Sequence, residues 1–161
     1  MKLYHGSNVV VKNPQILLSD RRLDFGTGFY LTSSFEQAER WAQLTTARRG
    51  EGHPVVTVYD FDEAKLATLT VLCFEKANKR WLDFVAENRS GRGEDAKWDV
   101  VIGPVANDRT MPVIRLFMAK VYTSAEAVRR LLPQLLHDQY VFKTEAALQL
   151  LTFQGAIENE H

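Results

Sequence analysis

Two short segments near the start of the chain concentrate residue types that suit a flat, hydroxylated ligand. They are Leu3–Ser7 (LYHGS) and Phe25–Thr32 (FGTGFYLT). In the first, the His5 imidazole can hydrogen-bond a hydroxyl group, and Gly6 lets backbone come close to a ligand. In the second, Tyr30 follows a glycine-rich turn and offers a ring for stacking. Together they predict a binding site for a planar ligand that carries hydroxyl groups.

The sequence lacks the residue patterns of a metal site, of a Rossmann dinucleotide-binding site and of a P-loop. The chain has one cysteine and four histidines, and the histidines show no metal-ligand spacing, so no bound metal is predicted. Gly26 and Gly28 lack the third glycine of a Rossmann fingerprint, because Leu31 occupies that position, and no P-loop lysine is present. Cys73 lies in an apolar stretch and is predicted to be a core residue.

Composition and charge predict one globular domain. The chain has 161 residues, of which 45% are hydrophobic and 25% charged. Twenty basic residues balance twenty acidic ones, so no overall charge would hold the chain on nucleic acid or on a membrane. No secretory signal and no membrane-spanning run are recognised, so the cytoplasm is the expected compartment. The Arg21-Arg22 pair lies between the two motifs, and we expect it to contact phosphate.

The two motifs need strands and a helix to position them. Residues 2–5 are predicted to form a strand that enters a turn at Gly6-Ser7, and residues 29–32 a second strand. Ser34 fits a helix N-cap, and Trp41 lies on the periodic face of a helix that should close at about residues 48–50.

The remaining pattern mixes strands and helices without regular alternation. Strands are predicted at residues 55–61, 69–74, 98–102 and 139–142, with helices at 76–88, 112–121, 125–136 and 145–151 and a loop at 90–95. Pro133 is expected to kink or shorten the helix at 125–136. Gly103-Pro104 should end the strand at 98–102. Residues 1–154 are therefore expected to form one α+β domain with a mostly antiparallel core, and residues 155–161 a frayed tail.

The two motifs resemble segments of a known group of enzymes. Leu3–Ser7 looks like the L-x-H-G-S segment of ADP-ribosyltransferases of the poly(ADP-ribose) polymerase and diphtheria-toxin type, and Gly28–Leu31 resembles their G-x-Y-F segment. Trp41 lies eleven residues after Tyr30, where such enzymes place a second aromatic residue. Residues 99–108 and 139–144 also resemble a bacterial family known as a domain of unknown function. The resemblance implies a split antiparallel β-sheet core with peripheral helices and NAD⁺ as substrate.

The resemblance assigns roles to individual residues. His5 would hydrogen-bond a ribose hydroxyl of NAD⁺, Gly6 would hold the nicotinamide carboxamide through its backbone, and Ser7 would lie near the adenosine ribose. Tyr30 and Trp41 would sandwich the nicotinamide ring. The expected NAD⁺-binding residues are His5, Gly6, Ser7, Arg22, Gly28, Phe29, Tyr30 and Trp41.

The chain departs from the polymerases at the third catalytic position. Gln139 stands where they carry a glutamate, and Asp138 is the neighbouring alternative. A neutral amide forms weaker hydrogen bonds than a carboxylate, so polymer elongation is not expected. Asp108 would act as a general base toward the acceptor, or would simply belong to a turn before a helix. Ala38 replaces the serine that binds the carboxamide. The expected catalytic set is Gln139, Tyr30, His5 and Asp108.

These residues lead to two functional expectations of different classes. The first is a bacterial mono-ADP-ribosyltransferase that transfers ADP-ribose to a protein or nucleic-acid acceptor and releases nicotinamide. The resemblance adds a toxin or effector role with a small antitoxin as partner. The second is an inactive module that binds NAD⁺, ADP-ribose or a partner protein, and Gln139 and Ala38 support it. An NAD⁺ glycohydrolase is a third reading.

Overall fold

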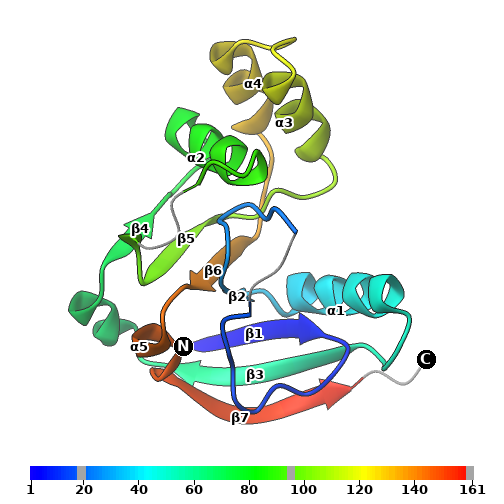
Figure 1. The fold of residues 1–161 in the computed structure, drawn as a ribbon, viewed down its shortest axis with the longest axis vertical. Helices are drawn as coiled ribbons and strands as arrows, with labels where there is room; N and C mark the ends of the chain where they lie inside the picture. The colour runs from blue at the N-terminus through cyan, green and yellow to red at the C-terminus, as the bar shows by residue number, and fades with distance from the viewer. Residues whose placement is uncertain (18–20, 94–96, 159–161) are drawn as a thin grey trace.

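The computed structural model describes residues 1–17, 21–93 and 97–158, and two β-sheets form its centre (Figure 1). The first sheet is antiparallel, in the order β1-β3-β7. Its strands are β1 (Lys2–Ser7), β3 (Val55–Phe61) and β7 (Leu151–Glu158). The second sheet has the order β2-β6-β5-β4. Its strands are β2 (Phe29–Leu31), β6 (Asp138–Phe142), β5 (Val100–Pro104) and β4 (Val71–Cys73). The α+β expectation is confirmed, with β4 and β5 paired in parallel.

Helices lie outside both sheets. The described helices are α1 (Phe35–Arg49), the short 3₁₀ helix η1 (Glu63–Thr68), α2 (Lys79–Arg89), α3 (Met111–Met118), α4 (Ser124–Leu131) and α5 (Glu145–Leu148). Helix α1 runs along the first sheet next to β1, whereas α2, α3 and α4 gather at one end of the second sheet (Figure 1). We call residues 109–137, which include α3 and α4, the helical lobe.

Helix α1 begins and ends where its local sequence dictates. The Ser34 hydroxyl oxygen accepts a hydrogen bond from Gln37 N at 3.2 Å, and Gly50 closes the helix with a positive φ of 69°. Its buried face, Ala38 and Ala42, packs directly on Gly6 of β1. A Cβ atom on Gly6 would lie 2.7 Å from Ala42 N and would collide with the Ala38 carbonyl oxygen. Gly6 is therefore required for the close approach of helix and strand.

Two hydrophobic clusters lie on opposite faces of the second sheet. Strand β6 sends Val141 into the cluster beneath α2–α4 and Phe142 into the cluster between the two sheets. Strand β2 alternates in the same way, because Tyr30 packs against the first cluster and Phe29 belongs to the second. Both faces of this sheet are therefore buried over these strands.

Several sequence expectations about boundaries are wrong. Gly6 and Ser7 lie inside β1 rather than in a turn, and Gly103 and Pro104 belong to β5. The expected effect of Pro133 is confirmed, since α4 ends at Leu131, two residues before this proline, whose ring cannot continue a helix. Cys73 is exposed, because β4 is a three-residue edge strand whose neighbouring Leu72 takes the buried position.

The end of the domain also differs from expectation. Residues 151–158 form β7, paired with β3 on both sides of a bulge at Gln154, where a helix end and a frayed tail were predicted. The apolar run around residue 150 fits both a helix and a strand, and pairing with β3 decides between them. Residues 159–161, and residues 94–95 of the predicted loop, lie outside the described residues. None of the described helices is long and apolar enough to cross a membrane.

Candidate functional site

The two sheets meet at Tyr4 and Thr32, and β1 and β2 part beyond that pair. Tyr4 N donates to Thr32 O at 2.8 Å, and Thr32 N donates to Tyr4 O at 2.9 Å. Continued antiparallel pairing would put Gly6 opposite Tyr30. Instead, the Tyr30 carbonyl oxygen lies 2.7 Å from His5 Nδ1. The imidazole therefore takes the place of a backbone hydrogen bond at the point where the strands separate.

This separation leaves the edge of β1 open at Gly6. Backbone groups of alternate residues point to opposite edges of a strand, so those of Gly6 share the edge that Tyr4 uses for Thr32. Strand β3 occupies the other edge. No described residue hydrogen-bonds Gly6 at this open edge, although the residue is buried. A buried N–H and C=O without partners are costly, which favours a ligand or water at this position.

His5 is held in one tautomer beside the open edge. Because a carbonyl oxygen only accepts hydrogen bonds, Nδ1 carries the proton and Nε2 is left as an acceptor. Burial lowers the pKa of His5 to about 4; the Tyr30 carbonyl opposes this shift, and the charge of Arg49 adds to it. Its ring stacks on Phe29, with centroids 4.1 Å apart. The imidazole is therefore neutral at physiological pH, and no described residue bonds its Nε2.

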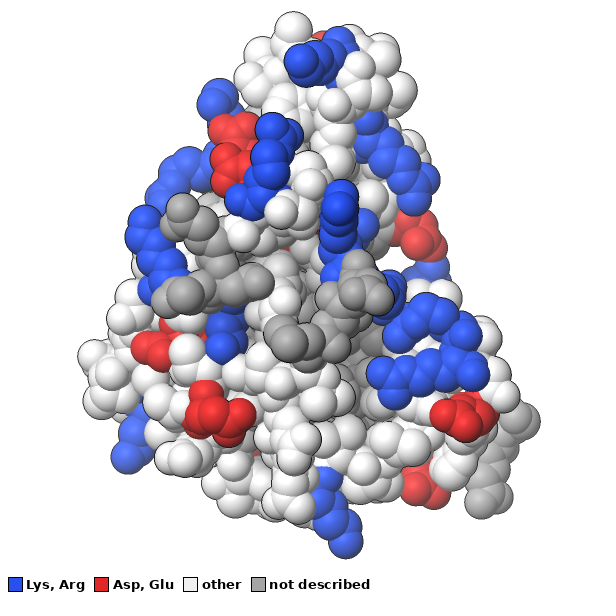
Figure 2. Space-filling model, viewed as in Figure 1, with Lys and Arg blue, Asp and Glu red and all other residues white. Residues whose placement is uncertain are grey.

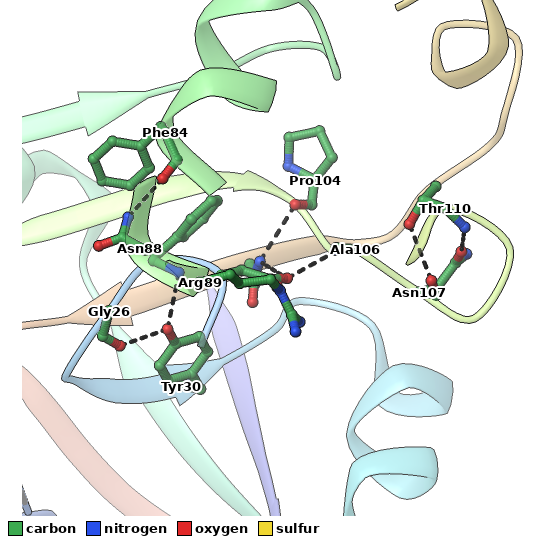
Figure 3. Close-up of polar contacts among 12 residues, drawn as sticks. Gly26, Tyr30, Phe84, Asn88, Arg89, Pro104, Ala106, Asn107 and Thr110 are labelled. Atoms are coloured by element: carbon green, nitrogen blue, oxygen red, sulfur yellow. Dashed lines mark hydrogen bonds and ion pairs between the residues drawn. The ribbon is translucent and has the colours of Figure 1, made fainter. Parts of the chain in front are cut away.

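Tyr30 is fixed by the glycine-rich turn that precedes it. Its hydroxyl donates to Gly26 O at 2.6 Å and accepts from Phe25 N at 3.0 Å (Figure 3). The buried Lys143 donates to Phe25 O at 2.6 Å and to Thr27 O at 2.8 Å. These bonds hold the turn against β6, so the orientation of the tyrosine ring is set before any ligand binds.

Gly28 and Trp41 were both expected to bind the ligand, and their surroundings differ. A Cβ atom on Gly28 would lie 2.5 Å from Val141 Cγ1, so this glycine is required by packing against β6. Trp41 is half-buried and forms no ring contact with a described residue. In the sequence it directly precedes Ala42, whose backbone nitrogen packs on Gly6. Part of the Trp41 side chain is therefore exposed, and no other described aromatic ring stacks on it.

Gln139 lies in a buried polar cluster. Its side chain is 1% exposed, and its Nε2 donates to Asp24 Oδ2 at 3.1 Å and to Pro104 O at 3.3 Å. Arg89 Nε donates to Asp24 Oδ1 at 2.7 Å, and Ala106 N donates to Asp24 Oδ2 at 3.1 Å. Figure 3 shows Arg89, Pro104 and Ala106 converging on this cluster. Sequence reasoning missed Asp24, because a single carboxylate between Leu23 and Phe25 carries no recognisable spacing.

The other carboxylates near the predicted site stabilise structure. Asp138, the alternative to Gln139, accepts hydrogen bonds from Ser33 N at 2.9 Å and from Thr32 Oγ1 at 3.3 Å, and so fixes the entry to α1. Asp108 forms an exposed ion pair with Arg40 of α1. This pair brings the loop before α3 to α1, but it leaves Asp108 engaged with a cation.

Asp99 also stabilises the fold. Hydrogen bonds from Thr70 N at 2.8 Å and Thr144 Oγ1 at 2.7 Å lower its pKa, in that order of importance. These bonds tie β5 to the start of β4 and to α5. Asp99 therefore connects three elements of the fold.

Two residues predicted to bind NAD⁺ have other partners. The buried Ser7 hydroxyl donates to Asn8 Oδ1 at 3.3 Å. Arg22 is exposed and donates to Ser90 O at 3.3 Å, away from β1. Arg49 instead reaches the end of β1, where its Nη1 donates to the same Asn8 oxygen at 3.1 Å. In the sequence the 48–49 arginine pair marked only the expected end of a helix.

Positive charge gathers beside this end of β1. Partial burial, followed by the charges of Arg21 and Arg49, lowers the pKa of Arg48. These arginines are therefore close enough to repel one another. Figure 2 shows Lys and Arg side chains grouped over α1. An anionic ligand group would relieve this repulsion.

Comparison with known proteins identifies the family of this chain. A family model described as "Protein of unknown function (DUF3990)" matches residues 1–153. The chain belongs to the DUF3990 family. No curated protein and no solved structure matches it. Every residue predicted for the site lies within the DUF3990 match.

The DUF3990 domain brings together part of the predicted set. Where β1 and β2 part, His5 contacts the backbone carbonyl of Tyr30, and Gly6 follows His5 on β1. Gln139 lies on the same face of the second sheet as Tyr30, because Tyr30 pairs with Val141 two residues further along β6. His5 touches β2 from the opposite, Phe29 side.

The remaining features lie elsewhere. Arg22 lies apart from the junction of β1 and β2. A hollow of about 540 Å³ near Met1 and Gln149 contains none of the predicted site residues. Within the described ranges, no group of three His, Cys, Asp or Glu side chains could hold a metal ion.

Proposed function

We propose that this DUF3990 protein binds NAD⁺ at the open edge of β1 and transfers its ADP-ribose to an acceptor. The proposal depends on one observation: among the described residues, none bonds the N–H or C=O of Gly6 at this edge. A nicotinamide carboxamide offers one acceptor oxygen and two N–H donors. It would therefore pair with Gly6 as a short strand would, satisfying both backbone groups with two hydrogen bonds.

Neighbouring groups support the rest of the ligand. The unpartnered Nε2 of the neutral His5 is suited to accept a hydrogen bond from a ribose hydroxyl. The partly exposed ring of Trp41 and the fixed ring of Tyr30 would supply aromatic surface for stacking. Arg48 and Arg49 would meet the diphosphate beyond the end of β1. The two-sheet arrangement is compatible with the split-sheet core of ADP-ribosyltransferases, and that finer assignment is part of the proposal.

The transfer itself follows from these contacts. When the bond between nicotinamide and the ribose breaks, nicotinamide leaves with the bonding electrons and positive charge builds on the ribose. The acceptor nucleophile then bonds to the ribose carbon and loses its proton. The amide of Gln139 carries no charge, so it stabilises the cationic ribose less than a carboxylate would. We therefore expect slow transfer of a single ADP-ribose unit.

The first experiment measures ligand binding and nicotinamide release together. Calorimetry with nicotinamide and with NAD⁺ should show saturable binding to the wild-type protein, and Trp41→Ala should weaken both by about tenfold, the loss of one stacking contact. Trp98→Ala is the matched control, since Trp98 is also half-buried but lies before β5. If neither compound binds the wild-type protein, the proposed function is wrong.

A second candidate is a module that binds NAD⁺ or ADP-ribose without chemistry. The deep burial of Gln139 and its bond to Asp24 favour it. Incubation with NAD⁺ labelled in the ADP-ribose part separates the candidates. Label on a macromolecule, lost in Trp41→Ala, supports transfer. Free labelled ADP-ribose with nicotinamide indicates a glycohydrolase, and binding without nicotinamide release indicates the module.

The acceptor and the biological role belong to the same proposal. The helical lobe carries five basic residues and one acidic residue in a chain of zero net charge. This excess favours an acidic protein segment or a nucleic acid as acceptor. For a bacterial toxin acting in the cytoplasm, expression in bacteria should arrest growth, and Trp41→Ala should relieve the arrest. A small antitoxin would then be sought as a second protein that restores growth.

A further inference from the structure

The buried carboxylate of Asp24 organises the polar cluster around Gln139. Asp24 is 5% exposed and accepts hydrogen bonds from three donors on three separate elements: Arg89 Nε at 2.7 Å, Ala106 N at 3.1 Å and Gln139 Nε2 at 3.1 Å. An ion pair with Arg89 balances its charge. The position of this carboxylate is therefore fixed by α2, by the segment after β5 and by β6 together.

Asp24 also determines which end of the Gln139 amide points inward. The carboxylate of Asp24 and the carbonyl of Pro104 are acceptors only, so the amide group that faces them must be the NH₂. Both of its N–H bonds are thereby used. Oε1 lies on the other branch of the amide, and no described residue donates a hydrogen bond to it. A flipped amide would set its oxygen against two acceptor oxygens.

We propose that Asp24 is a positioning residue that holds the Gln139 amide with Oε1 free to accept a hydrogen bond from a ribose hydroxyl of the ligand. This role toward the ligand rests on the proposed function. It also explains the residue type at this position: a glutamate would put a second acceptor-only carboxylate 3.1 Å from Asp24. Two carboxylates at that separation cannot both ionise freely. With Asp24 in place, position 139 requires a donor.

The first test needs no ligand. Asp24 and burial would raise the pKa of the carboxyl group that Gln139→Glu introduces. Because its pKa is raised above the ordinary value of about 4.3, this group stays protonated at the acid end of the range and can donate to Asp24, as the amide does. Thermal unfolding from pH 4.5 to 8 should therefore show a small loss of Tm in acid that grows to about 5 °C or more at pH 8.

Two further proteins separate this mechanism from general damage. Gln154→Glu adds a carboxylate at an exposed position of β7 and should show no growing loss. The double variant Asp24→Asn with Gln139→Glu restores one donor between the two side chains, and its loss of Tm should no longer depend on pH. If Gln139→Glu lowers Tm by the same amount at all pH values, position 139 does not require a hydrogen-bond donor and this part of the proposal is overturned.

The second test concerns the ligand. Asp24→Asn allows the Gln139 amide to turn, so affinity for ADP-ribose and NAD⁺ should fall about tenfold, the value of one hydrogen bond. Affinity for nicotinamide alone should not change, because Gly6 would hold it.

Different results would refute the positioning role and the proposed function. Equal weakening of nicotinamide and ADP-ribose would indicate a structural role only and would overturn the positioning role. If wild-type protein binds none of these compounds, the proposed function fails and the ligand role with it. The pH dependence of Gln139→Glu would still decide the orientation of the amide.

Discussion

Replacing Gly6 with alanine tests the junction of β1 and α1 most directly. The new methyl group would lie 2.7 Å from Ala42 N and closer still to the Ala38 carbonyl oxygen. Heavy atoms in ordinary contact are about 3.5–4.0 Å apart, so the helix would have to retreat by roughly 1 Å or more. Both obstructing atoms belong to helix backbone, so no change of rotamer relieves the collision.

The size of the effect follows from this geometry. Overpacking costs about 1–3 kcal/mol, and a backbone obstruction belongs at the upper end of that range. A domain of this size loses about 2–4 °C of Tm per kcal/mol. We therefore expect Gly6→Ala to lower Tm by roughly 6–12 °C. Because α1 carries Trp41, binding of nicotinamide should be lost as well.

The assay is thermal unfolding followed by circular dichroism, with two double variants as controls. Gly28→Ala collides chiefly with the side chain of Val141, so combining it with Val141→Ala should cost less than the sum of the two single changes. Gly6→Ala combined with Ala38→Gly should be additive, since the obstructing oxygen is present in every residue type. A fall in Tm below about 2 °C for Gly6→Ala would refute the reasoning.

Three further predictions concern groups with a defined environment. The folded-state pKa of His5, about 4, lies below its unfolded value of 6.5, so the stability of the fold should decline as pH falls from about 6.5 to 4. Urea unfolding should show a loss of up to about 3 kcal/mol over this range, and His5→Gln should lack it. Tyr30→Phe removes the hydroxyl bonded to Gly26 O and Phe25 N and should cost about 1–2 kcal/mol of unfolding free energy in the same assay. Exposed Cys73 should react with a thiol reagent in the folded protein, and the rate should still be rising above pH 8.5, because partial burial, followed by the charge of Glu75, raises the thiol pKa.

What could be predicted from the sequence was encoded locally. Helix α1 was predicted within a residue because Ser34 and Gly50 act on their own helix ends. Strand β3 was predicted because its β-branched and aromatic content is continuous. Strand β7 was missed, since only pairing with β3, about a hundred residues earlier, makes that polar segment a strand.

The candidate site shows the same contrast between residues that local sequence reveals and residues whose role depends on distant partners. His5, Gly6 and Tyr30 could be selected because the motifs that hold them are short and contiguous. Asp24 could not, because its meaning depends on Arg89 and Gln139, which are distant in the sequence. The expected reason for Gly6 was also incomplete. Its missing side chain accommodates α1, whereas the predicted ligand contact concerns its backbone.

The two roles of Gly6 are linked through His5. Antiparallel pairing extended from Tyr4 and Thr32 would close the edge of β1 by joining Gly6 to Tyr30. That closure requires the Tyr30 carbonyl, and His5 Nδ1 already occupies it at 2.7 Å. A neutral imidazole is well suited to this task, because burial holds its pKa near 4 and keeps a single proton on the nitrogen that faces the carbonyl. The imidazole therefore takes the hydrogen bond that would begin this closure, and among the described residues none bonds either its Nε2 or the Gly6 backbone groups at the open edge.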